Sequence, residues 1–348
     1  MSDNKRRPSI VSLLAGAWRN SPADLELDSQ LLQDAAPLVL GSLAGALAWW
    51  KVKHSDLAST TAGLELQEAY RFHTIRSALR EHSLKQAISF LAAAGVEPIL
   101  VKGWAIARLY PEPGLRPYGD FDLVVRPKDY EAASSAAKEI RGEYGVDLHS
   151  GFDELDYHSF DELYARSTLV KLDDLDVRVL SPEDHLRVLC LHMLHHSAFR
   201  PLWLCDIAVA VETRAPDFNW DICLGKNPRR ADWIACSIGL AHRLLGANID
   251  DTPIANRAKT LPAWLISNVL KQWETPYSMS QPPVSYAAPM SKYLRDPRGL
   301  LADLRRRWPN AIEATVYTGG PFNELPRWPF QIGECVIRAA KFLARISS

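Results

Sequence analysis

The chain has 348 residues, of which 47% are hydrophobic and 23% charged, and its formal net charge is −1. These values are typical of a globular protein that buries a substantial core. Because Lys and Arg are not in excess overall, the composition argues against a polymerase or a tRNA-binding enzyme that holds nucleic acid by charge. The basic clusters at residues 5–7 and 305–307 are short, and we expect them to be solvated.

The cysteines and the apolar runs indicate the cellular location of the protein. Five widely spaced cysteines without a C-x-x-C pair indicate reduced thiols, and hence a cytoplasmic protein. We find no signal peptide, and the uncharged run at residues 35–50 is shorter than the roughly 20 apolar residues that a membrane-spanning helix needs. A membrane partner is therefore not expected, except through an amphipathic helix at residues 332–346, for which docking on its own domain is favoured.

The first part of the chain is predicted to be helical. Residues 1–28 are expected to form a loosely ordered lead-in with one amphipathic turn around residues 10–18. Apolar spacing of three and four residues then predicts helices within residues 29–53 and 57–94, and Gly95 is typical of a residue that follows a helix C-terminus. Together these segments form a predicted N-terminal helical arm, residues 1–95.

A strand, a turn and a second strand follow. Residues 99–101 are apolar and end at Lys102-Gly103, where glycine permits a tight turn, and residues 104–110 favour a short helix. Residues 120–125 alternate as a strand that sends Asp120 and Asp122 to one face. Two carboxylates on one face repel each other, so a divalent cation between them is the simplest explanation, and hard oxygen ligands suit Mg²⁺.

Further elements complete a predicted core at residues 96–180. A helix is expected from residue 127 to about residue 140, followed by a short strand at residues 145–149 with Asp147 and His149 on one face. Two more extended runs, residues 168–172 and 177–180, flank a turn.

A helical domain, residues 181–275, is predicted next. Ser181 followed by Pro182 and two acids is a typical helix start. On that helix His185, His192 and His196 fall within ~40° of one another, which leaves a polar edge of a packed helix and a nucleotide contact both open. Helices are also expected at residues 203–212, 229–245 and 254–273, with Trp203 and Asp206 packing inward. Residues 276–348 then form a proline-rich connector and a C-terminal helix.

At this point the chain resembles a broad bacterial family of uncharacterised nucleotidyltransferases within the DNA polymerase beta-like superfamily. The resemblance extends over roughly residues 60–250 and is carried by the following motifs: Lys102-Gly103, Tyr110-Pro111, Arg116, Gly119-Asp120-Phe121-Asp122, Val146-Asp147-Leu148-His149, Ser181-Pro182-Glu183-Asp184-His185 and Trp203-Leu204-Cys205-Asp206. It implies an α+β fold with a mixed sheet.

The resemblance also implies roles for single residues. Asp120, Asp122 and Asp147 would be the catalytic and metal-binding carboxylates and would hold two Mg²⁺ ions. The nucleotide and its phosphates would contact the following residues: Lys102, Gly103, Arg116, His149, His192 and His196. The solvated-face and core interpretations of the histidines stay open beside these roles.

These residues together predict a cytoplasmic, Mg²⁺-dependent transferase that moves a nucleoside monophosphate from a nucleoside triphosphate, with ATP the expected donor. The acceptor is unknown, and a small molecule, peptide or glycan precursor is favoured over nucleic acid. One alternative is a toxin-like nucleotidyltransferase that modifies tRNA or protein. The other is a nucleotide-binding or scaffold protein without turnover.

Overall fold

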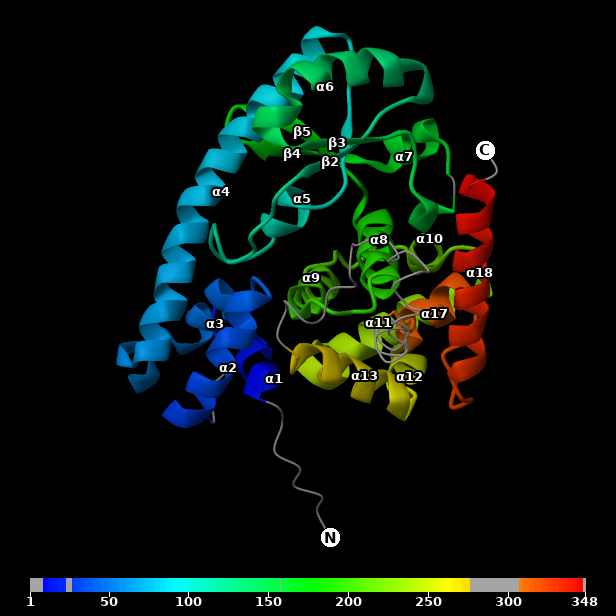
Figure 1. The fold of residues 1–348 in the computed structure, drawn as a ribbon. Helices are drawn as coiled ribbons and strands as arrows, with labels where there is room; N and C mark the ends of the chain where they lie inside the picture. Colours follow the sequence, from blue (N-terminus) through cyan, green and yellow to red (C-terminus); the bar gives the residue numbers. More distant parts are fainter. Residues whose placement is uncertain (1–8, 23–26, 157, 276–306, 347–348) are drawn as a thin grey trace, which may run out of the picture.

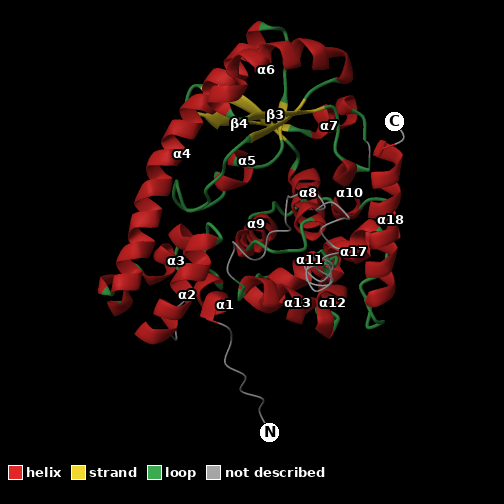
Figure 2. Cartoon of the chain, viewed as in Figure 1, coloured by secondary structure: helices red, strands yellow, loops and turns green. Residues whose placement is uncertain are grey.

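A computed structural model describes residues 9–22, 27–156, 158–275 and 307–346. One mixed sheet lies at one end of the molecule, and helices cover it and form the rest (Figures 1 and 2). The predicted α+β fold is therefore confirmed. No helix within the described ranges is long and apolar enough to cross a membrane.

The sheet has five strands in the order β3-β2-β1-β5-β4. Their bounds are β1 Ile99–Leu100, β2 Phe121–Val124, β3 Val146–His149, β4 Thr168–Leu172 and β5 Leu175–Val179. Strand β2 pairs antiparallel with β1 and parallel with β3, while β5 pairs parallel with β1 and antiparallel with β4. All of the predicted strands are present, and the last two form a hairpin.

Two helices cover one face of the sheet. The long α4, Thr61–Ala93, runs down one side of the molecule, and α6, Tyr130–Tyr144, lies across its upper part (Figure 1). Leu84 and Leu91 of α4 join Phe121, Leu123 and Leu148 of the sheet in one buried apolar cluster. Burial of this surface is the main force that holds the helices on the sheet. The shorter elements around the sheet are α5 Trp104–Ala107, η2 Pro127–Asp129, η3 Asp153–Leu155 and α7 Phe160–Arg166.

The helical part after the sheet follows the predicted order with one correction. Helix α8 begins as expected, because the Ser181 side chain accepts a hydrogen bond from the Asp184 amide at 3.1 Å. The single helix predicted at residues 254–273 is wrong: it is divided into α12 and α13, since Pro262 precedes α13 and cannot continue a helix. The predicted connector falls largely on residues 276–306, outside the described ranges. The helices are α8 Pro182–His195, α9 Pro201–Glu212, α10 Trp220–Leu224, α11 Pro228–Leu240 with a π-turn at Ala241–Leu245, α12 Ala255–Ala258, α13 Ala263–Trp273, α17 Ala311–Tyr317 and α18 Trp328–Ile346.

The predicted loose lead-in is wrong for residues 9–22. Helix α1, Ser9–Leu14, joins α2, Ser29–Gly41, and α3, Gly45–Val52, in a compact base. Ile10 and Leu13 are fully buried, and the indole of Trp18 donates a hydrogen bond to Glu212 at 2.8 Å. The sequence does not show which segments such a short apolar run contacts; in the structure they are α2, α3 and the π-turn at Ala241–Leu245.

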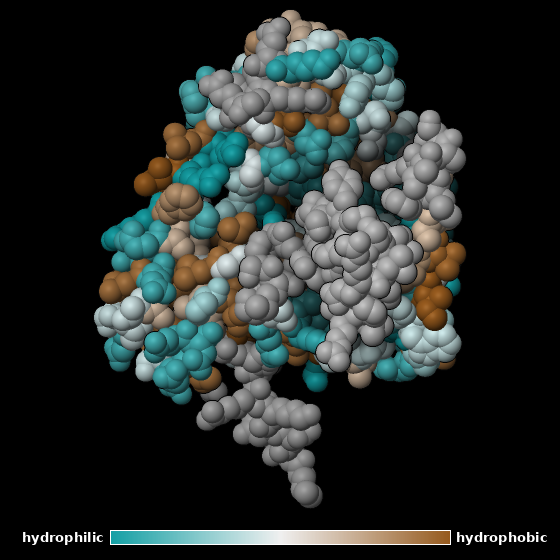
Figure 3. All heavy atoms as spheres, in the orientation of Figure 1, coloured by the Kyte–Doolittle hydropathy of each residue, from teal (hydrophilic) through white to brown (hydrophobic). Residues whose placement is uncertain are grey.

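The C-terminal helix α18 docks on its own chain, as the sequence favoured. Arg338 contacts Glu313 of α17 at 2.6 Å, and Gln331 donates to the Pro309 carbonyl. Its outer face leaves Trp328, Ile332 and Val336 exposed, and apolar atoms gather there at the edge of Figure 3.

The N-terminal correction can be tested by substitution. Leu13→Ala should lower the free energy of unfolding by about 2–5 kcal/mol, because it leaves a cavity at a fully buried position. Urea denaturation measures the change. Leu79→Ala, at a side chain that is 63% exposed on α4, is the matched control and should have little effect. Equal effects would show that residues 9–22 do not belong to the core.

Candidate active site

The register of two parallel strands brings the central polar side chains together. Asp122 of β2 lies opposite Asp147 of β3, and Val124 lies opposite His149. Because side chains alternate along a strand, Asp147 and His149 share one face of the sheet, and Asp122 shares it with them. The local sequence Val146-Asp147-Leu148-His149 buries its two apolar residues on the other face.

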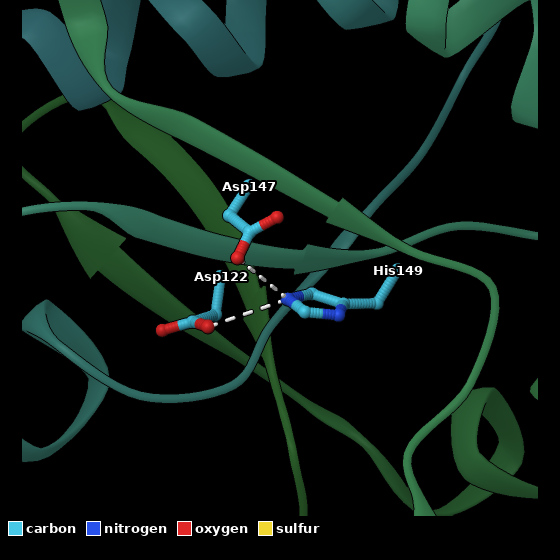
Figure 4. Close-up of side chains that lie close together, drawn as sticks. All are labelled: Asp122, Asp147 and His149. Atoms are coloured by element: carbon cyan, nitrogen blue, oxygen red, sulfur yellow. Dashed lines mark ion pairs between the residues drawn. The ribbon is translucent and has the colours of Figure 1, made fainter. Parts of the chain in front are cut away.

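These three side chains form a compact cluster. The His149 Nε2 atom lies 3.3 Å from Asp122 Oδ1 and 3.3 Å from Asp147 Oδ2 (Figure 4). One ligand atom from each residue lies within 4.8 Å of the others. Figure 4 shows the two carboxylates turned toward the edge of the imidazole ring. This spacing suits a single cation that all three side chains could bind.

The state of the imidazole supports that fit. His149 Nε2 is buried and makes no well-formed hydrogen bond, although two carboxylate oxygens lie nearby. Its ring packs against Phe152 with the centroids 4.4 Å apart, which fixes its orientation. A buried polar atom without a hydrogen bond costs free energy, and a bound metal ion would give the nitrogen a partner. The residues present therefore fit a divalent metal ion.

Lys102 sets the charge of this cluster. Its ammonium lies 3.1 Å from Asp122 Oδ1. Burial alone would raise the pKa of Asp122, but the nearby His149 ring and Lys102 outweigh it and lower that pKa. Asp122 is therefore a carboxylate at neutral pH, as a metal ligand must be.

Asp120 lies apart from the cluster. The sequence placed it on the same strand face as Asp122, but β2 begins only at Phe121, and Asp120 is exposed in the bend before it. Its carboxylate is not in the group that gathers within 4.8 Å. Gly103 packs against this bend with a φ of 61°, and a Cβ atom there would lie 3.3 Å from the Asp120 carbonyl oxygen. A side chain at position 103 would thus press on the start of β2.

Asp120 and Asp122 open into a cavity of about 550 Å³. The Lys102-Gly103 turn lines the same end of it, and His73 and Arg76 of α4 line one side. Helices α8 and α9 and their connecting turn supply an aromatic surface at the other end, which we call the aromatic wall: His192, His196, Phe199 and Trp203. Asp122 belongs to both the cavity and the metal-binding cluster.

The aromatic wall is a set of rings in mutual contact. The Trp203 ring lies 5.1 Å from His192 and 4.9 Å from Phe199, both nearly edge to face, and His192 lies 4.5 Å from His196. Burial, reinforced by the positive charge of Lys102, lowers the pKa of His192 well below its ordinary value and also lowers that of His196. Both imidazoles are therefore neutral at pH 7.

A strained turn places one end of this wall. Ser197 and Ala198 both adopt left-handed backbone conformations, with φ of 60° and 57°. Neither is glycine, so the conformation is held by its surroundings: the side chains of Gln272 and Trp273 donate hydrogen bonds to the Ser197 and Ala198 carbonyls. The chain then leaves the turn through Phe199. Sequence reasoning missed Phe199 because nothing in Ser-Ala marks a left-handed turn.

Arg116 is engaged inside the protein. Its guanidinium binds Asp206 of α9 through Nη2 at 2.7 Å and Nε at 3.1 Å, and the Tyr110 hydroxyl donates to the same carboxylate at 2.8 Å. All three side chains are buried. Arg116 lines the cavity wall, but its donors to Asp206 hold the loop before β2 against α9.

The remaining histidines of α8 lie elsewhere. His185 is buried, its Nε2 has no hydrogen-bond partner, and burial lowers its pKa to about 3. His195 faces Glu154, with 3.3 Å between Nδ1 and Oε1. The three histidines grouped by helical angle are thus divided: His192 and His196 line the cavity, and His185 does not.

A mixed sheet with two in-register carboxylates beside a lysine-glycine turn and a cavity agrees with the arrangement expected of a nucleotidyltransferase. The chain belongs to the uncharacterised nucleotidyltransferase family, whose sequence model matches residues 39–142 and 137–246, more than half of the chain. This confirms the resemblance drawn from the motifs. No curated protein and no solved structure is similar enough to match the chain.

The neutral His185 predicts a pH dependence of stability. Its pKa is about 3 when folded and 6.5 ordinarily, so between these values the unfolded chain binds a proton that the folded chain does not. Stability should therefore fall as the pH drops below 6.5, by up to about 1.4 kcal/mol per pH unit from this group. Urea denaturation at pH 7.5, 6 and 5 should show a shallower loss in His185→Leu than in wild type. His82→Leu, at an exposed position on α4, is the control. If the stability of wild type and of His185→Leu changed equally with pH, His185 would not have a lowered pKa in the folded protein.

Proposed function

We propose that this nucleotidyltransferase moves a nucleoside monophosphate from a nucleoside triphosphate, with ATP the expected donor, to a hydroxyl or phosphate of a small-molecule, peptide or glycan-precursor acceptor. The observation that carries the proposal is the Asp122–Asp147–His149 cluster, which reaches the cavity through Asp122. A site for metal and phosphate thus lies beside a space of about 550 Å³, within the range of about 300–1,000 Å³ that is usual for small ligands.

Asp122, Asp147 and His149 would hold a divalent metal ion, which when bound neutralises phosphate charge and acidifies an acceptor hydroxyl. A second ion of the expected pair would draw on Asp120, at the mouth of the same cavity. Lys102, 3.1 Å from Asp122, would contact the phosphates beside the Gly103 turn.

The transfer itself needs a base near the acceptor. The acceptor oxygen forms a bond to the α-phosphorus, the bond from that phosphorus to pyrophosphate breaks, and the acceptor proton passes to a carboxylate. Asp147 is suited to take it, because its side chain is 57% exposed while Asp122 is 10% exposed and paired with Lys102. Arg116 would act by positioning the loop that carries Asp120, since its guanidinium is bound to Asp206.

A small acceptor or a short segment of a larger one is favoured by charge. The chain has a formal net charge of −1, so it lacks the overall positive charge that non-specific nucleic-acid binding requires. The toxin-like alternative would need a positively charged surface for tRNA, or a docking surface for a protein.

Thermal unfolding tests the donor site. With Mg²⁺, a nucleoside triphosphate at 100 times its dissociation constant should stabilise the folded protein by about 2.7 kcal/mol. This stabilisation by the nucleotide should require the metal and should be lost in Asp122→Asn. Asp161→Asn, at an exposed aspartate that pairs with Arg126, is the matched control and should keep it. A rise that persists in Asp122→Asn, or that needs no metal, would contradict the proposed site. Donor binding with no turnover on any acceptor would favour the scaffold alternative.

The imidazole in the ligand set predicts which metal binds better. Mg²⁺ prefers oxygen ligands, whereas Mn²⁺ also accepts imidazole, so Mn²⁺ should bind the protein more tightly than Mg²⁺. His149→Phe should weaken Mn²⁺ binding by at least about tenfold, since the loss of even an outer-shell partner of a metal ligand costs about 10–100-fold. Electron paramagnetic resonance of free Mn²⁺ gives the Mn²⁺ affinity of wild type and of His149→Phe, and displacement of Mn²⁺ by Mg²⁺ gives the Mg²⁺ affinity. Neither measurement needs turnover. His158→Phe, at a histidine outside the cluster, is the control. Unchanged Mn²⁺ affinity in His149→Phe would remove His149 from the ligand set.

A further inference from the structure

The cavity is lined by two chemically different sets of side chains. Lys102, Asp120 and Asp122 bring charge to it, and the aromatic wall brings rings. Both sets line one space. A ligand that fills it should therefore carry both charge and a flat apolar surface.

The wall is suited to stacking. Its two imidazoles are neutral at pH 7, so they offer ring faces and single N–H groups, and the positive charge beside them is that of Arg200, which also lines the cavity. Trp203 and Phe199 meet nearly edge to face, and both line the cavity. The guanidinium carbon of Arg200 lies 5.2 Å from the Trp203 ring centre, so the cluster already holds one planar group against an aromatic face.

The arrangement is held in place and is not a chance gathering of side chains. The two left-handed residues Ser197 and Ala198 bring Phe199 to the cavity, and hydrogen bonds from Gln272 and Trp273 hold both carbonyls. Backbone strain of this kind persists only where neighbouring contacts enforce it, and it is common at ligand sites.

We propose that the aromatic wall binds the nucleobase of the nucleoside triphosphate donor by stacking, with Trp203 as its principal ring. The proposal rests on the proposed function, because it assigns the far end of the same donor. It replaces the expectation that Trp203 serves packing alone. Since every base has a flat π-face, stacking tolerates all four bases and favours the larger purines.

The experiment distinguishes the contribution of the base to binding affinity from that of the phosphates. Calorimetry in the presence of Mg²⁺ compares ATP, CTP and inorganic tripolyphosphate, which has the charge of the donor but no base. In wild type, ATP should bind more tightly than CTP, and both more tightly than tripolyphosphate. Trp203→Leu should weaken ATP binding by about five- to 150-fold and leave tripolyphosphate binding unchanged.

Three further variants guard against a folding defect. Trp203→Phe keeps an aromatic ring and should recover most of the ATP affinity. Phe199→Leu, in the turn between the helices, should weaken ATP binding without altering tripolyphosphate binding. Trp220→Leu removes a half-buried tryptophan that packs on Phe218 outside the cavity, and it should leave both affinities unchanged.

The outcomes distinguish this inference from the function beneath it. If wild type binds tripolyphosphate as tightly as ATP, or if Trp203→Leu leaves ATP affinity unchanged, the base does not lie on the wall although the phosphate site stands. If Trp203→Leu weakened the binding of ATP and of tripolyphosphate equally, Trp203 would only support the structure. If wild type binds neither ligand, the donor site itself fails and the base site fails with it.

Discussion

The buried contact of Arg116 with Asp206 is the constraint on which the arrangement of the site depends. Arg116 lies in the loop before β2, and Asp206 lies on α9, so the pair joins the sheet to the helices across the cavity. Tyr110 adds a hydrogen bond to the same carboxylate. Such a pair is weak support for stability, because removing both charges from water costs about as much as their attraction returns. Its value is geometric: a bidentate guanidinium–carboxylate contact is satisfied in one relative placement of the two elements. Arg116, which the resemblance assigned to the nucleotide and its phosphates, therefore also holds the loop before β2 against α9.

A second constraint, the parallel register of β2 and β3, sets the metal-binding cluster. A shift of one residue would turn Asp147 and His149 to the apolar face, where α6 packs, and would send Val146 and Leu148 toward solvent. The hydrophobic cost of that exchange locks the register, so the positions of the polar side chains are determined by the burial of the apolar ones. Lys102 enters from the neighbouring strand end and reaches the same carboxylate. Core packing and site geometry are here consequences of one alternation pattern.

Much of this could be predicted from local sequence, and the failures share a cause. The strands and the Ser181 cap follow from alternation, capping and turn residues, which are local, whereas the family resemblance implied the α+β class. The burial of Ile10 and Leu13 was missed, because it depends on the packing of α1 against α2, α3 and the π-turn at Ala241–Leu245, which the local pattern does not encode. Asp120 and Asp122 both line the cavity, but β2 begins one residue later than the pattern suggested and only Asp122 joins the cluster with Asp147 and His149. The partners of Arg116 and the left-handed turn at Ser197 arise from tertiary contacts that no spacing encodes. The catalytic and nucleotide-binding roles of the named residues stay predictions.

The distribution of charge around the cavity follows in part from one side chain. Lys102 lies 3.1 Å from Asp122, and its positive charge helps to keep that carboxyl group ionised. The same positive charge, together with burial, disfavours protonation of His192 and His196. A single ammonium thus contributes to two opposite outcomes: an anionic carboxylate in the Asp122–Asp147–His149 cluster, and neutral imidazoles in the aromatic wall. Under the proposals made above, the carboxylate would serve a metal ion and the neutral rings would serve a flat base.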